Sequence, residues 1–175
     1  MTIENPNFLS PLGFKFIVNK LPNVNYFCQS VTIPSVSIGS IPIAHGIATV
    51  PFPGSRLTFD PLTIRFKVDE NLRNYIEILN WLRGLGHPNS LEETRQLSAQ
   101  SPQFSRIGTA ASYVSDATLA ILSSHKNPTH MVNFKDVFPT QLSEITFTSS
   151  DSDVNYIDAT VIFSYLNFDI EVLDN

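Results

Sequence analysis

One stretch of this chain spaces its apolar side chains clearly like an α-helix, and it lies between long runs in which apolar and polar residues alternate. The helical spacing predicts a helix over about 70–84, in which Ile76 and Leu79 would pack onto a sheet. Asp69 is a favoured N-cap residue, and the helix should end at the breakers Gly84, Gly86 and Pro88. A chain with so little helix has to build most of its core from strands.

The alternating runs predict these strands, at 14–18, 24–33, 57–68, 142–148 and 157–165. The last two runs predict a C-terminal hairpin, whereas 113–122 fits a helix and a strand equally well. A single helix among such strands does not suit a parallel series of strand–helix–strand units. We therefore expect a mainly β (α+β) fold, an antiparallel β-barrel or sandwich with one flanking helix.

Residues 40–58 form the most unusual segment, with three prolines and two glycines among branched apolar residues. Proline cannot donate to a strand ladder, so a proline-rich strand belongs at a sheet edge or in a protruding hairpin. We expect a long arm that docks on a neighbouring subunit or ring, because its large apolar side chains would form an exposed patch if they were left in water. Such patches mark interaction sites. The predicted contact residues are Ile41, Ile43, Ile47, Val50, Phe52 and Leu57.

The charge of the chain is low and unevenly spread. Charged residues make up 15% of the 175 residues, against a norm of roughly 25%. Residues 1–88 carry seven Lys and Arg against five Asp and Glu, whereas 89–175 carry four against eleven. No Lys or Arg follows Lys135, so the last part of the chain should repel nucleic-acid phosphates. No run approaches the ~18 apolar residues of a membrane span, and we expect no membrane partner.

No motif in the sequence predicts catalysis. The glycine-rich phosphate loops and the G-x-S-x-G nucleophile motif are absent. The single cysteine, Cys28, lies in an apolar run, which favours a buried structural thiol. Residues 151–155 copy the start of a calcium loop, but Tyr156 stands where that loop needs glycine, and His125 and His130 lack a third ligand at a familiar spacing. We expect no enzyme, no metal and no cofactor.

Three segments, taken together, resemble the tail tube protein family of contractile-tailed phages. One is a strand with a D-x-L-T-I-x-F pattern, followed by an acidic turn and a helix with a Y-x-x-I-x-x-W pattern. Another is a strand ended by proline, VTIP, with the proline-rich stretch of the arm. The last is the FPTQLSEITF run with the closing strand after it. In this sequence they are 57–85, 31–34 with 51–56, and 138–147 with 157–168.

The resemblance implies a structural virion protein of a contractile tail, which forms or extends the ring-stacked inner tube that conducts DNA. It implies a ring of six copies whose neighbours are adjacent tube rings, sheath or baseplate proteins. DNA would be passing cargo, without specific nucleic-acid binding. Baseplate hub, tube-initiator and tail-terminator proteins share the fold and are alternatives. A more distant alternative is a non-viral β-sandwich ligand-binding module, in which 40–58 would be a ligand loop. A tail protein would be made in the host cytoplasm and end in the virion.

A ring that conducts DNA should keep basic side chains out of its lumen, because they would hold phosphates. Glu144 and Asp158 lie on polar strand faces of the part without Lys or Arg, and they are the candidates to face the lumen. We expect 1–175 to form a single tail-tube-like domain. A polar insertion is expected at about 87–130, where the chain departs from the family pattern.

Overall fold

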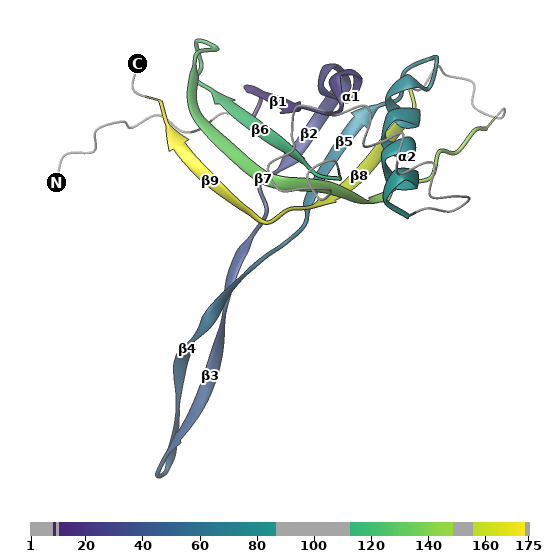
Figure 1. Ribbon diagram of the computed structural model, residues 1–175. Helices are drawn as coiled ribbons and strands as arrows, with labels where there is room; N and C mark the ends of the chain where they lie inside the picture. Colours follow the sequence, from purple (N-terminus) through teal and green to yellow (C-terminus); the bar gives the residue numbers. More distant parts are fainter. Residues whose placement is uncertain (1–8, 10, 87–112, 149–155, 174–175) are drawn as a thin grey trace.

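The computed structural model describes residues 9, 11–86, 113–148 and 156–173, which contain nine strands and two helices (Figure 1). The strands are β1 (Phe14–Val18), β2 (Cys28–Thr32), β3 (Val36–His45), β4 (Ala48–Phe59), β5 (Leu62–Lys67), β6 (Ser115–Leu122), β7 (Pro128–Leu142), β8 (Asp158–Ser164) and β9 (Asn167–Val172). The helices are α1 (Pro22–Phe27) and α2 (Arg73–Gly86). The expected mainly β fold, with a flanking helix and a protruding hairpin, is confirmed.

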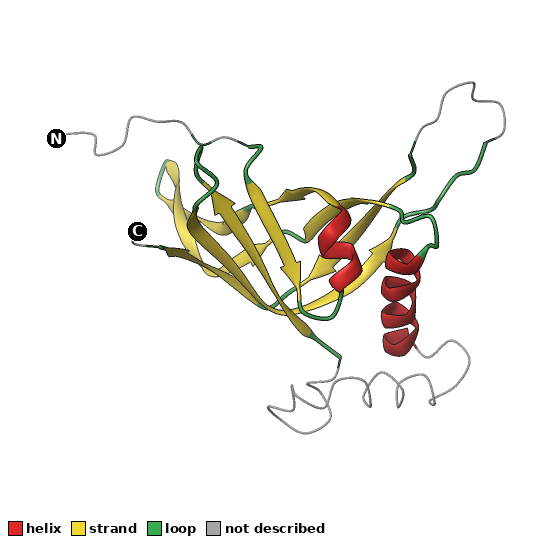
Figure 2. Cartoon of the chain, turned by 90° about the horizontal axis from the view of Figure 1, so that it is seen from above, coloured by secondary structure: helices red, strands yellow, loops and turns green. Residues whose placement is uncertain are grey.

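Seven of the strands form one antiparallel sheet in the order β1-β6-β7-β8-β5-β2, with β9 alongside β7. Among the described residues no pairing joins β1 to β2, so the sheet is an open, curved one. Strands β3 and β4 pair only with each other and project away from this body as a long arm (Figure 1). Figure 2 shows the strands curving around the core, with α2 at one end.

The 15-residue strand β7 joins the two halves of the sheet. Its first part pairs with β6 and β9, and its last part pairs with β8. The register shifts three times along it: once opposite Asp116, once opposite the step from Ile121 to Leu122 of β6, and once between Pro139 and Gln141. Near the first shift Asp136 has a φ of 56°, a left-handed conformation that Asp tolerates better than most residues. Bulges of this kind bend a strand, which lets β7 carry both halves around one core.

The core is built from the alternating positions of the central strands. On β5, Leu62, Ile64 and Phe66 are fully buried, as the alternation predicted. Phenylalanines from four strands fill the centre, and each contributes roughly 1.5–3 kcal/mol by leaving water. These are Phe16, Phe66, Phe134 and Phe163. Trp81 of α2 closes one side, with its ring 6.1 Å from that of Phe163 and its indole N–H donating to the Tyr113 carbonyl at 2.8 Å.

The helix α2 packs with a different face from the predicted one. Ile78 and Trp81 are buried, whereas Ile76 is 45% exposed and Leu79 lies outside the core cluster. The prediction that Ile76 and Leu79 hold the helix to the sheet is therefore wrong. Apolar residues surround most of this helix, so their spacing alone does not say which stripe faces the sheet.

The beginning of α2 depends on buried Asn74 rather than on Asp69. The Asn74 side-chain amide donates to the Lys67 carbonyl at 2.8 Å, and its oxygen accepts from the Asp69 backbone N–H at 3.2 Å. These bonds tie the end of β5 to the helix across a turn in which Leu72 has a φ of 55°. The helix consequently begins at Arg73, three residues later than predicted.

Two of the predicted strands are wrong in part. Residues 22–27 form α1 rather than strand, with proline at the start of the helix and Asn25 bonded to both backbone groups of Val18. The prediction of a strand over 142–148 also fails, because β7 ends at Leu142 and Phe147 is 74% exposed. The partner of β8 in the C-terminal hairpin is the last part of β7 instead.

The polar insertion expected at about 87–130 falls mainly on 87–112, which lie outside the described residues. The last part of the range 87–130 contains β6, which pairs on both sides within the sheet, with β1 and with β7. Residues 115–122 are thus a strand of the sheet, and an insertion at 87–112 stays a prediction.

Candidate functional site: the β3–β4 arm

The arm is an antiparallel hairpin closed by a two-residue turn. His45 pairs with Ala48, and between them Gly46 has a φ of 60°. A glycine with positive φ at the first central position is typical of a type II′ turn, whose twist matches that of the strands. Ile47, the other turn residue, is fully exposed at the tip.

Large apolar side chains lie opposite one another across the arm. Ile41 pairs with Phe52, Ile43 pairs with Val50, and Leu57 pairs with Ile38 nearer the body. All six predicted contact residues are exposed, four of them between 47% and 58%, which are Ile41, Ile43, Val50 and Phe52. A two-stranded hairpin is marginally stable alone in water. The exposed apolar side chains of the arm are therefore a candidate surface for contact with another molecule.

The arm has a bulge halfway along, where the register shifts between Ile38 and Ser40. Gly54 crosses Gly39 there so closely that a Cβ atom on Gly54 would lie 2.6 Å from the Gly39 carbonyl oxygen. A Cβ on Gly39 would meet nothing within 4 Å. Only glycine fits at position 54 without moving the backbone, so this contact fixes the path of the outer part of the arm.

The root of the arm is tied to the body by an aromatic cluster and three hydrogen bonds. The Phe59 ring lies 6.1 Å from that of Tyr165 and 5.7 Å from that of Phe168. The Tyr165 hydroxyl donates to the Asp60 carbonyl at 2.8 Å. Asp60 in turn donates its N–H to the Ser35 carbonyl at 3.1 Å and accepts from the Ser35 hydroxyl. These bonds set the direction in which the arm leaves the sheet.

Burial, and then the charge of Asp60, raise the pKa of the Tyr165 hydroxyl. The group therefore stays protonated and able to donate at neutral pH. An open hollow of about 420 Å³ lies beside it, lined by Phe59, Asp60, Pro61, Thr140, Gln141, Ile162, Ser164 and Tyr165. In the described part of the chain no three His, Cys, Asp or Glu side chains gather as a metal site would require.

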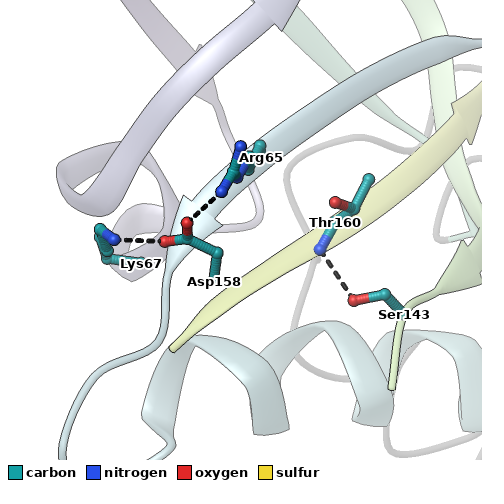
Figure 3. A network of polar contacts seen from close by, with 5 residues as sticks. All are labelled: Arg65, Lys67, Ser143, Asp158 and Thr160. Carbon is teal, nitrogen blue, oxygen red and sulfur yellow. Dashed lines mark hydrogen bonds and ion pairs between the residues drawn. The ribbon is translucent and has the colours of Figure 1, made fainter. Parts of the chain in front are cut away.

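Of the two lumen candidates, Asp158 is the first residue of β8 (Figure 3). The Asp158 carboxylate contacts Arg65 and lies 2.7 Å from the Lys67 ammonium. Glu144 follows Ser143, whose hydroxyl accepts from the Thr160 backbone N–H at 2.9 Å. Two cations offset the negative charge of Asp158. Glu144 is exposed and takes no part in these ion pairs, so it is the candidate whose negative charge is not offset by them.

The remaining candidates from the sequence do not form a site. Cys28 is half-buried, and burial raises the pKa of its thiol to about 11, so it is not a thiolate at neutral pH. The calcium-like segment 151–155 lies outside the described residues. No helix within the described ranges is long and apolar enough to cross a membrane. The sequence did not reveal the root of the arm, since Phe59 only lay near the start of one alternating run and Tyr165 at the end of another.

Comparisons with known proteins identify relatives of this chain by sequence and by fold. The chain matches the model of the phage tail tube protein family over residues 6–171. The tail tube terminator protein of Enterobacteria phage T4 is 29% identical over 147 residues, which are 82% of this chain and 76% of that protein. A chain of the anti-feeding prophage cap, which terminates the tube, has the same fold, with a TM-score of 0.61 and 12% identity over 99% of this chain and 97% of that one.

A chain of the sheath–tube complex of PVC, an extracellular contractile injection system in its extended state, also shares the fold. Its TM-score is 0.57 and its identity 14%, over 96% of this chain and 94% of that one. At such identities the solved structures show the fold alone, whereas the family match spans nearly the whole sequence. The chain belongs to the phage tail tube protein family, whose members are structural proteins and not enzymes.

Proposed function

We propose that this protein is a structural component of a contractile phage tail that forms a ring of six copies and terminates the inner tube. The observation that carries the ring is the arm, which holds its large apolar side chains in water while the body has its own buried core. The relative that is a tail tube terminator, similar over 82% of this chain, supports a place at the end of the tube.

The dimensions of the arm favour a ring over a simple pair. Its 10-residue strand β3 is roughly 33 Å long, at ~3.3 Å per residue. A two-stranded face about 10 Å wide would then offer on the order of 300 Å², below the ~800 Å² that each partner buries in a stable interface. One arm contact is therefore weak. A closed ring with head-to-tail interfaces repeats the contact, and every copy both gives and receives an arm.

A tube subunit is the second candidate function. The matching family is that of the tail tube itself, and one structural neighbour is a chain of a sheath–tube complex. In either function the partners would be further copies of the chain and neighbouring tail proteins such as sheath, adjacent tube rings or baseplate. DNA would pass through as cargo, and the protein would belong to the virion tail.

We place the start of β8 at the lumen of this ring, where Glu144 and Asp158 were expected to lie. Asp158 contacts both Arg65 and Lys67 and offsets one of their two positive charges, and Glu144 adds a second negative charge at this end of the sheet. Both effects reduce the binding of DNA to the wall.

Native mass spectrometry with negative-stain imaging of the purified protein tests the proposal. A terminator should give particles of six times the monomer mass that stay single rings as the concentration rises. Stacking into long tubes would overturn the terminator in favour of the tube subunit. A monomer at every concentration would contradict both and favour the ligand-binding module.

A further inference from the structure

The prolines of the arm make its edges poor templates for another strand. In a hairpin closed by a two-residue turn, the pair beside the turn exchanges hydrogen bonds and successive pairs then alternate. Counting back from His45 and Ala48, the pairs Pro42–Pro51 and Ser40–Pro53 occupy positions where each N–H would point outward. Pro51 and Pro53 therefore remove two outward donors from β4, and Pro42 removes one from β3. Missing donors interrupt the ladder that an added strand would form, most of all along β4.

The two faces of the outer arm differ. The pairs Ile41–Phe52 and Ile43–Val50 place bulky apolar groups on one face. The opposite face holds small or flat side chains, namely Ser40, Pro42, Ala44, Thr49, Pro51 and Pro53. Within 36–59 the only charged side chain of the Lys, Arg, Asp and Glu types is Arg56. The surface that fits the bulky face is therefore apolar and uncharged.

The same chain exposes a second apolar strip, on β9. Ile170 pairs with Val132 and Val172 pairs with His130, so both lie on the face of the sheet that continues into the core. Val132 is fully buried, yet Ile170 is 55% and Val172 is 64% exposed. In the part of the chain that the structure describes, β9 pairs with β7 alone. The apolar face of the sheet thus ends in an uncovered strip.

The root of the arm is fixed by Phe59 and Asp60, and Phe59 contacts Phe168 at the start of β9. From there the outer part of the arm projects away from the body and from the rest of its own β9 (Figure 1). We propose that the arm of one copy packs its bulky face, residues Ile41, Ile43, Val50 and Phe52, onto Ile170 and Val172 of a second copy, without adding a strand to the sheet of that copy. This inference rests on the proposed ring, in which one copy must offer two different complementary patches.

Disulfide capture tests this pairing. In a Cys28→Ser background, the double variant Phe52→Cys with Ile170→Cys should give, on mild oxidation, a ladder of linked copies that ends at the ring size. Each single-cysteine variant should give no ladder, because one patch meets a different patch and not itself. If the unmodified protein forms rings and the double variant stays unlinked, the inference is wrong while the proposed function stands. If the unmodified protein stays monomeric, both are wrong.

A set of polar substitutions separates face packing from strand addition. Ile43→Ser with Val50→Ser changes a pair on the bulky face and should shift sedimentation from rings to monomers. The matched control, Ala44→Ser with Thr49→Ser, changes the adjacent pair on the flat face and should leave the rings intact. Pro51→Thr with Pro53→Thr restores the outward donors and should still give rings of the same size. Rings that survive the first change, or are lost with the third, would overturn face packing.

Discussion

Lys67 and Asp158 lie directly opposite each other on the antiparallel strands β5 and β8, and the Lys67 ammonium is 2.7 Å from a carboxylate oxygen of Asp158. Arg65, two residues earlier on β5, contacts the other oxygen. The interaction with Lys67, and then that with Arg65, lower the pKa of Asp158. At this end of the sheet a single carboxylate thus lies between two cations.

Replacing Asp158 by asparagine should destabilise the monomer by about 1 kcal/mol or less at neutral pH, because Arg65 is largely exposed and surface pairs are weak. A lowered carboxyl pKa stabilises the fold above the ordinary value of 3.8 and ceases to do so as the pH falls through the folded value. Urea unfolding at several pH values should therefore show wild type and Asp158→Asn converging in acid. Asp169→Asn, at the exposed pair with Lys135, is the control and should change little.

The two isoleucines of α2 give a test of which helix face is buried. Ile78 is fully buried, so Ile78→Ala should lower the free energy of unfolding by roughly 2–5 kcal/mol. Ile76→Ala removes the same atoms from a side chain that is 45% exposed and should cost clearly less. Equal losses in the two variants, measured by chemical unfolding, would contradict the packing of α2.

The bulge of the arm predicts that two glycines respond differently to the same change. Gly54→Ala places a Cβ atom 2.6 Å from the Gly39 carbonyl oxygen, so the outer arm must shift. Gly39→Ala meets nothing within 4 Å and should be tolerated. Because the arm lies outside the core, both variants should unfold near the wild-type midpoint, while only Gly54→Ala weakens ring formation in sedimentation. An unchanged ring from Gly54→Ala would show that the path of the arm does not matter.

The stability of the fold should also change with pH in the alkaline range. Burial lowers the pKa of Lys20 from 10.5 to about 8, so above pH 8 the unfolded chain binds more protons and stability rises with pH. Burial raises the pKa of Cys28 from 9.0 to about 11, which has the opposite sign above pH 9. Unfolding midpoints should rise from pH 8 to 9 and then level off. Lys20→Gln should abolish the rise, and Cys28→Ser should extend it beyond pH 9. A flat wild-type profile would contradict the assignment for Lys20.

The parts of the fold that could be predicted are those in which one face of an element is buried. Leu62, Ile64 and Phe66 alternate with polar residues, and only one register of β5 buries all three. Which of Ile76 and Ile78 is buried could not be predicted, since apolar residues surround most of α2. Residues 24–27 are strand-like in composition but form α1, where Pro22 at the helix start and the bonds from Asn25 to Val18 outweigh local preference.

The candidate site was partly predictable for a similar reason. The combination of prolines with large apolar groups identified 40–58 as an arm, because such a segment cannot lie inside a sheet. Its anchoring could not be predicted. The bond from Tyr165 to Asp60 joins residues 105 positions apart, and the close crossing of Gly39 and Gly54 depends on a register shift. Neither leaves a periodic signal in one sequence.

Removal of the outer arm tests the central claim, that the arm joins copies of this protein into an assembly. Replacing residues 43–53 by a short Gly-Ser turn deletes the tip, the three pairs nearest to it and the β4 partners of residues 40–42, but leaves the root at Phe59 and Asp60 in place. Sedimentation velocity of this variant beside wild type, with circular dichroism to confirm the folded body, is the measurement. The account predicts a folded monomer where wild type forms rings. Rings of wild-type size from the shortened protein would contradict it.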